Sequence, residues 1–159
     1  MPIAVDLDDL LIKNAASIFE MMVMVGMEKT DNKDLAIVEE ERLGVITFEG
    51  PTHGCLGILC SKECAGQLAA NMLCVDDPAT LSIEEVDDAI REITNMVMGA
   101  IKADPDINLN EVQLSIPVVI RGREIEHDLG ERPERISVMT LVDGRFPVEL
   151  TLLWSQAVA

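Results

Sequence analysis

The chain has 159 residues, of which 48% are hydrophobic, and 29 acidic against 12 basic residues give it a formal net charge of −17. This charge repels phosphate backbones and anionic lipids, and one Trp, three Phe and no Tyr offer few rings for stacking on bases. The composition therefore argues against nucleic-acid and membrane-surface binding, and predicts one globular domain over residues 1–159.

The first predicted element is a helix from Leu7 to about Val25, in which apolar residues recur at steps of three and four. Aspartates at its start favour a helix N-terminus, and Gly26 is expected to end it. The opening Met1-Pro2-Ile3 has no basic region typical of a secretory signal, and the apolar stretch around 21–27 is too short to span a bilayer. We therefore expect a soluble, cytoplasmic protein.

A β-hairpin is predicted to follow a charge-rich segment. Within residues 28–42, the short apolar patch 35–38 is a candidate edge strand. Two apolar runs, 43–49 and 55–60, are then separated by Gly-Pro-Thr-His-Gly, a sequence typical of a turn between strands.

A second helix is predicted from Lys62 to Leu73, with Ser61 as its N-cap. An acidic, Pro-containing connector at 75–81 follows it. The longest helical pattern then runs from Ile83 to Ala103, where Asp-Pro ends it. Ser and Glu three residues apart at its start form a capping-box signature.

Three further strands complete the chain, at 111–120, 136–142 and 146–154. Asp143-Gly144 joins the last two and is a strong signal for a tight turn. A loop rich in charge, Gly and Pro occupies 121–133.

The order of elements predicts an α+β fold, with a largely antiparallel sheet covered by two long helices. Glu20-Met-Met-Val-Met-Val in the first helix aligns with Glu92-Ile-Thr-Asn-Met-Val in the long helix, and each half of the chain continues into a hairpin. This internal echo predicts two pseudo-duplicated half-domains.

The long helix separates into an apolar and a polar face at about 100° per residue. The apolar face consists of Val86, Ile90, Ile93, Val97, Ala100 and Ile101, and the polar face of Glu84, Asp88, Glu92, Asn95, Gly99 and Lys102. Asn is a mediocre helix former, and Gly99 costs about 1 kcal/mol relative to Ala. A small residue beside an amide and a carboxylate would let a partner approach the helix closely, although polar residues at this spacing often do no more than keep a surface solvated.

The residue types on the polar face narrow the chemistry. No His, Cys or Ser falls on it, so a nucleophile–base pair is absent, and Asp88 with Glu92 would form a carboxylate pair on a convex surface, where no pocket raises a pKa. An Asn amide donates and accepts hydrogen bonds without charge, which suits it to orient water toward an anionic electrophile. Seven carboxylates against one Arg between Asp76 and Glu92 would repel a phosphoryl group and attract a partner that presents a Lys.

The four cysteines provide the remaining candidate chemistry. Cys55, Cys60, Cys64 and Cys74 contain no CxxC pair, so we expect buried free thiols in a reduced cytoplasm and no metal site. An unrelated α+β domain that binds a metal through cysteines or carboxylates stays open as an alternative.

The pattern Asp88-x-x-x-Glu92-x-x-Asn95, followed by Met96-Val-Met-Gly99 and by Ser115-Ile-Pro117, resembles the signature of the CheC, CheX and FliY phosphatases of bacterial chemotaxis. The resemblance implies hydrolysis of the aspartyl phosphate on a CheY-type receiver. It assigns Asn95 to orient the attacking water and Glu92 to contact the active-site Lys of the receiver, with Asp88 and Pro117 in support. The receiver would bring both the acyl phosphate and its Mg²⁺, so this chain needs no cofactor.

The first helix distinguishes between the branches of this family. CheC-like members carry Glu-x-x-Asn on both pseudo-symmetric helices, whereas here Glu20 is followed by Val23. The resemblance is therefore to the CheX-like branch, with a single active site, and it implies a homodimer in which the sheets join. The alternative function is a non-catalytic receiver-binding or flagellar-switch-type adaptor.

Overall fold

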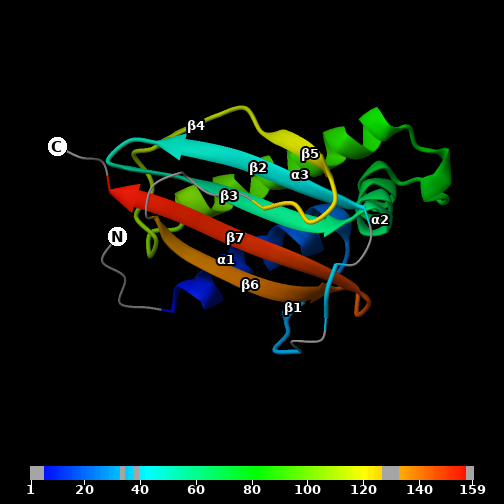
Figure 1. The fold of residues 1–159 in the computed structure, drawn as a ribbon, viewed down its shortest axis with the longest axis horizontal. Coiled ribbons are helices and arrows are strands. Elements are labelled where there is room, and N and C mark those ends of the chain that lie inside the picture. Colours follow the sequence, from blue (N-terminus) through cyan, green and yellow to red (C-terminus); the bar gives the residue numbers. More distant parts are fainter. Residues whose placement is uncertain (1–5, 33–34, 38–39, 127–132, 157–159) are drawn as a thin grey trace.

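The computed structural model describes residues 6–32, 35–37, 40–126 and 133–156. Within these residues, seven strands form one sheet in the order β1-β6-β7-β3-β2-β4, with β5 also paired to β2. All neighbouring strands are antiparallel, and the helices lie against one face of the sheet (Figure 1).

In chain order the elements are α1 (Leu7–Ile18), the π-helical turn η1 (Phe19–Val23), β1 (Met27–Lys29), β2 (Glu41–Glu49), β3 (Thr52–Ser61), α2 (Lys62–Leu73), the 3₁₀ turn η2 (Pro78–Thr80), α3 (Ile83–Ala103), β4 (Gln113–Leu114), β5 (Val118–Gly122), β6 (Glu134–Val142) and β7 (Phe146–Gln156).

Side-chain caps determine where α2 and α3 begin. The Ser61 hydroxyl accepts a hydrogen bond from the Cys64 amide at 3.0 Å. Ser82 and Glu85 form the predicted capping box, with reciprocal bonds of 3.1 and 3.0 Å. Both helices therefore have the predicted bounds.

The helical layer differs in part from the prediction of two long helices. In the described part of the chain, α3 has 21 residues, whereas α1 and α2 have 12 each. α1 continues into η1, and Met24, with φ at +61°, ends this segment in the left-handed conformation, so Gly26 does not end it as expected. None of the described helices is both long and apolar enough to cross a membrane.

Two predicted strands need correction. Residues 35–37 are not in a strand, residue 38 lies outside the described residues, and the edge beside β6 is formed by β1 instead. The strand predicted at 111–120 is divided into β4 and β5, because Ser115-Ile116-Pro117 lies between them and proline has no N–H to donate to the ladder.

The strand order agrees with the internal echo in the sequence. β1 follows α1 but pairs with β6 of the second hairpin, and β5 follows α3 but pairs with β2 of the first hairpin. The two hairpins meet where β3 pairs with β7. If the corresponding strands of the two halves are exchanged, β1 with β5, β2 with β6 and β3 with β7, the same strand order is obtained in reverse. This symmetry supports the predicted duplication.

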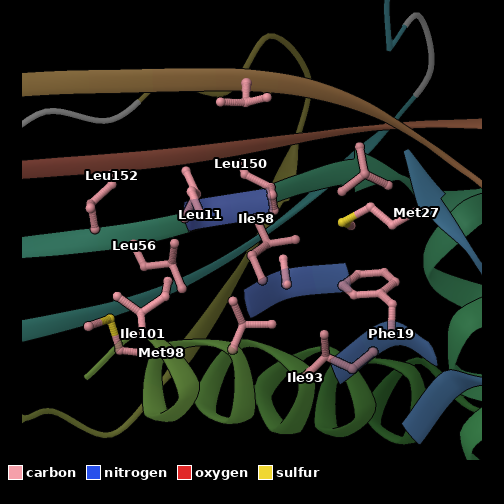
Figure 2. Packing of buried hydrophobic residues seen from close by; sticks show 14 of the residues in the cluster. Leu11, Phe19, Met27, Leu56, Ile58, Ile93, Met98, Ile101, Leu150 and Leu152 are labelled. Atoms are coloured by element: carbon pink, nitrogen blue, oxygen red, sulfur yellow. The ribbon is translucent and has the colours of Figure 1, made fainter. Parts of the chain in front are cut away.

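The core between helices and sheet is largely aliphatic (Figure 2). The helices and central strands contribute residues that are at most 2% exposed, among them Leu11, Ile58, Ile93, Ile101 and Leu150. At Gly44 on β2, a Cβ would lie 2.1 Å from the Thr94 Oγ1 of α3. Only glycine therefore allows α3 to pack this closely on the sheet through the face that carries Thr94.

Candidate functional site

α3 has one buried face and one exposed face, as predicted. The buried face is apolar and at most 2% exposed at Ile90, Ile93, Val97 and Ile101. On the opposite side Asp88, Glu92 and Asn95 are exposed, and Gly99 is partly exposed one turn beyond Asn95. We call these four residues the α3 ridge.

The side chains of Glu92 and Asn95 are free to meet a partner. Neither makes a hydrogen bond or ion pair to any residue that the structure describes. Asp88 differs, because its carboxylate pairs with Arg91 on the same helix. The ridge also lies outside the cavity of about 540 Å³ between α2, η2 and the first turn of α3, which none of its residues lines. The ridge therefore suits contact with a large partner rather than enclosure of a small molecule.

Gly99 has no packing role that explains it. A Cβ built at Gly99 would meet nothing within 4 Å, whereas at Gly54 it would lie 2.0 Å from the Leu153 carbonyl oxygen. Glycine inside a helix costs about 1 kcal/mol relative to alanine, and the protein interior does not require it here. A smooth helix surface beside Asn95 is what the close approach of another chain needs.

Buried carboxylates fix both ends of α3. Near its start, Asp87 lies 3.4 Å from the Nε of Arg121 on β5 and 3.9 Å from the Nε of Arg42 on β2. At its end, Asp104 accepts hydrogen bonds from the Asn14 side chain of α1, at 2.9 Å, and from the Asp106 amide, at 3.0 Å. The Asn14 bond is the main reason why the pKa of Asp104 is lowered. These contacts connect α3, which carries the ridge, to the sheet at one end and to α1 at the other.

Pro117 is separated from the ridge in the fold. It is half-buried in the segment between β4 and β5, the strands that pair with β2 at this edge of the sheet. Ser115, two residues before Pro117, still pairs with β2, since its amide donates to the Thr47 carbonyl at 2.9 Å and its hydroxyl accepts from the Thr47 amide at 2.9 Å. Pro117 therefore shapes the strand beside α3 and lies on a different element from Asn95.

The position in the first helix that corresponds to Asn95 is buried. Glu20 is exposed, as is its counterpart Glu92, but Val23 is 0% exposed. Val23 is the last residue of the π-helical turn η1, whereas Asn95 lies in a regular α-helix. This half of the fold thus lacks both the amide and a surface position for it.

Three of the four cysteines are inaccessible and do not form a reactive site. Cys55, Cys60 and Cys64 are buried as expected, whereas Cys74, the C-cap of α2, is exposed, so the expectation of a buried thiol is wrong for Cys74. Burial raises the pKa of the Cys55 thiol to about 11, and a hydrogen bond with Cys60, together with burial, raises the pKa of Cys64. Among the described residues, no three His, Cys, Asp or Glu side chains lie close enough to hold a metal ion.

Sequence reasoning missed Arg91 and Asp87. On a helical wheel Arg91 follows Asp88 by three residues, a spacing typical of an ion pair, so the pair could have been found. Asp87 carries no local signal, because its burial depends on two arginines that are distant in the sequence.

Comparison with known proteins supports the family resemblance. The model of the family described as chemotaxis phosphatase CheX matches residues 42–139. The crystal structure of chemotaxis protein CheX from Vibrio vulnificus is similar with a TM-score of 0.73 and 20% identity, over 92% of this chain and 95% of that one. A putative chemotaxis protein from Desulfovibrio vulgaris Hildenborough gives 0.73 and 19%, over 96% and 98% of the two chains. The CheX–CheY–BeF₃–Mg²⁺ complex from Borrelia burgdorferi gives 0.72 and 18%, over 96% and 99%.

At these identities the structural similarities show the fold. No curated protein sequence matches the chain significantly. The family model covers the β2–β3 hairpin, all of α3 and most of β6, so it includes the whole α3 ridge.

Proposed function

The chain belongs to the CheX family of chemotaxis phosphatases, and from this premise we propose that it hydrolyses the aspartyl phosphate of a CheY-type receiver domain in the cytoplasm. The observation that carries the proposal is the α3 ridge, where the Glu92 and Asn95 side chains are exposed without partners among the described residues. The similar Borrelia structure is a complex of CheX with CheY, which supports a receiver as the partner.

Asn95 is the residue that acts on the phosphate. Its amide oxygen accepts a hydrogen bond from a water molecule, and its amide NH₂ can donate to a phosphoryl oxygen. The oriented water attacks phosphorus as the bond between phosphorus and the aspartyl oxygen breaks. The products are the receiver carboxylate and dihydrogen phosphate, which together carry the two negative charges of the starting acyl phosphate. The receiver brings its own Mg²⁺, so this chain supplies no metal ion.

Glu92 docks the receiver. In the proposed complex, its free carboxylate pairs with the active-site Lys that lies beside the phosphorylated aspartate. Such a pair favours both association and alignment, so loss of Glu92 weakens binding and rate together. Gly99 allows the close approach, while Asp88 and Pro117 support the site from α3 and from the neighbouring edge of the sheet.

Release of phosphate from a phosphorylated CheY-type receiver tests this function. The wild-type chain should accelerate release, and Asn95→Ala should abolish the acceleration. Thermal unfolding and receiver binding should stay close to wild type, since the Asn95 side chain makes no hydrogen bond with a described residue. Full activity in Asn95→Ala would exclude the assigned mechanism. Binding without any acceleration by the wild type would favour a non-catalytic adaptor, and a stoichiometric metal in elemental analysis would favour the metal-binding alternative.

We also propose a homodimer joined at the β5 edge of the sheet. Ile116 is 85% exposed, Val118 51% and Ile120 44%, and they alternate along one side of this edge. An exposed apolar edge strand presents unpaired backbone groups to which a second copy can add its own strand.

A further inference from the structure

Arg91 is a cation beside the α3 ridge to which the mechanism above assigns no task. It is the only basic residue from Ile83 to Asn95. Its guanidinium pairs with Asp88, and the two side chains are 39% and 74% exposed. Arg121, the basic residue that reaches the start of α3 from β5, is paired with the buried Asp87.

The Arg91–Asp88 pair is easily exchanged. Ion pairs between exposed side chains one turn apart contribute little to stability, because water screens them and two flexible side chains must be held in one arrangement. A phosphoryl group carries more charge than one carboxylate and offers three oxygens in a geometry that matches the guanidinium fork. It can therefore replace Asp88 as the partner of Arg91.

Arg91 is also in the right place. It lies four residues before Asn95, so the two side chains are neighbours on the helix surface. Helical side chains lean toward the N-terminus, which brings the Asn95 amide over the turn that carries Arg91. A phosphate that meets the Asn95 amide is therefore within reach of the Arg91 guanidinium.

We propose that Arg91 is a further catalytic residue, which leaves Asp88 when the receiver docks and binds the non-bridging oxygens of the aspartyl phosphate. This inference rests on the proposed phosphatase function and adds no bond-making step to it. Asp88 then acts through Arg91: it neutralises the guanidinium in the free protein and competes with the phosphoryl group for it. The arrangement offsets the repulsion that the carboxylates of α3 would otherwise exert on the phosphate.

The first test compares binding to a purified CheY-type receiver with and without trifluoroberyllate, a mimic of the phosphoryl group. Arg91→Met keeps the aliphatic stem and removes the charge. We expect it to lower affinity for the loaded receiver about tenfold or more, the usual effect of losing a hydrogen bond between charged groups, and to leave affinity for the unloaded receiver unchanged. Arg91→Lys should recover part of the loss. Lys62→Met, which removes an exposed charge at the start of α2, is the control for net charge.

A double-mutant cycle tests the part assigned to Asp88. Asp88→Asn should raise affinity for the loaded receiver, because the guanidinium no longer has a competing carboxylate, and should have no such effect when Arg91 is already Met. If Asp88→Asn changed the affinity for the loaded and the unloaded receiver alike, in both backgrounds, Asp88 would be merely structural and its role as the exchanged partner of Arg91 would be overturned.

Phosphate release separates this inference from the proposed function. If the wild type is active, Arg91→Met should lower kcat/KM about tenfold or more. The role of Arg91 would be refuted, and the phosphatase function would stand, if Arg91→Met kept the wild-type kcat/KM and the wild-type selectivity for the loaded receiver while Asn95→Ala was inactive. An inactive wild type would refute the phosphatase function, and the binding comparison would still decide whether Arg91 recognises the phosphoryl group.

Discussion

Replacing Gly99 by alanine should stabilise the protein and weaken its function. The added methyl group meets nothing within 4 Å, so the variant gains the helix propensity of alanine without a clash. That gain is about 1 kcal/mol, and in a chain of this size it should raise Tm by about 2–4 °C. In the docked complex the same methyl group must fit against the receiver, and overpacking of a close contact costs about 1–3 kcal/mol. Affinity for the receiver should therefore fall about 5- to 150-fold.

Calorimetry and titration with the loaded receiver measure the two effects separately. Gly44→Ala is the matched control, because the same substitution there would place a Cβ 2.1 Å from the Thr94 Oγ1. This clash should lower Tm, whereas Gly99→Ala should raise it. Gly99→Leu extends the series and should block docking while the fold is retained. The reasoning about the α3 ridge would be refuted if both Gly99 variants bound the receiver as tightly as the wild type.

Three further predictions concern the frame of the site. Asp104→Asn should lower the free energy of unfolding by about 1–2 kcal/mol. Because the folded-state pKa of Asp104 lies below its ordinary 3.8, this loss of stability should be complete well above pH 3.8 and should vanish as the pH falls through the lowered pKa. Urea unfolding at several pH values measures it. Val23→Asn should create no second active site in an Asn95→Ala background and should destabilise the fold by about 1–3 kcal/mol, since it places an amide at a fully buried position; phosphate release and urea unfolding check this. Val118→Lys should convert the proposed dimer to monomers in sedimentation experiments, and a wild type that is already monomeric would contradict the β5 interface.

The predictable parts of the fold are those that local chemistry decides. Ser61, and Ser82 with Glu85, satisfy the first amides of α2 and α3, so both helices begin where the sequence indicates. Asp143 and Gly144 both have positive φ, as a tight turn between β6 and β7 requires. The exposed face of α3 also follows from its helical period alone.

The parts that could not be predicted depend on distant contacts. Val23 ends a π-helical turn, and its carbonyl accepts a hydrogen bond from Asn71 of α2 at 3.1 Å, a partner 48 residues away. Asp87 resembles its acidic neighbours in sequence and is buried only because Arg42 and Arg121 reach it from the sheet. Local periodicity can find a ridge, but it cannot show what holds the ridge in place.

In the proposed complex, the charge of α3 favours an amide over a carboxylate as the group that faces the phosphate. A unit charge about 4 Å from a dianion is repelled by about 2 kcal/mol even in water. The carboxylate of Glu92 is therefore suited to a receiver Lys, and Asn95 can approach the phosphoryl group without this penalty. Asp88 is already neutralised by Arg91 in the free protein, so the turn that precedes Asn95 is less repulsive than its sequence indicates. In the duplicated half of the fold Glu20 is exposed and Val23 is buried, so a carboxylate that could dock a partner persists there without the amide that the proposed hydrolysis requires.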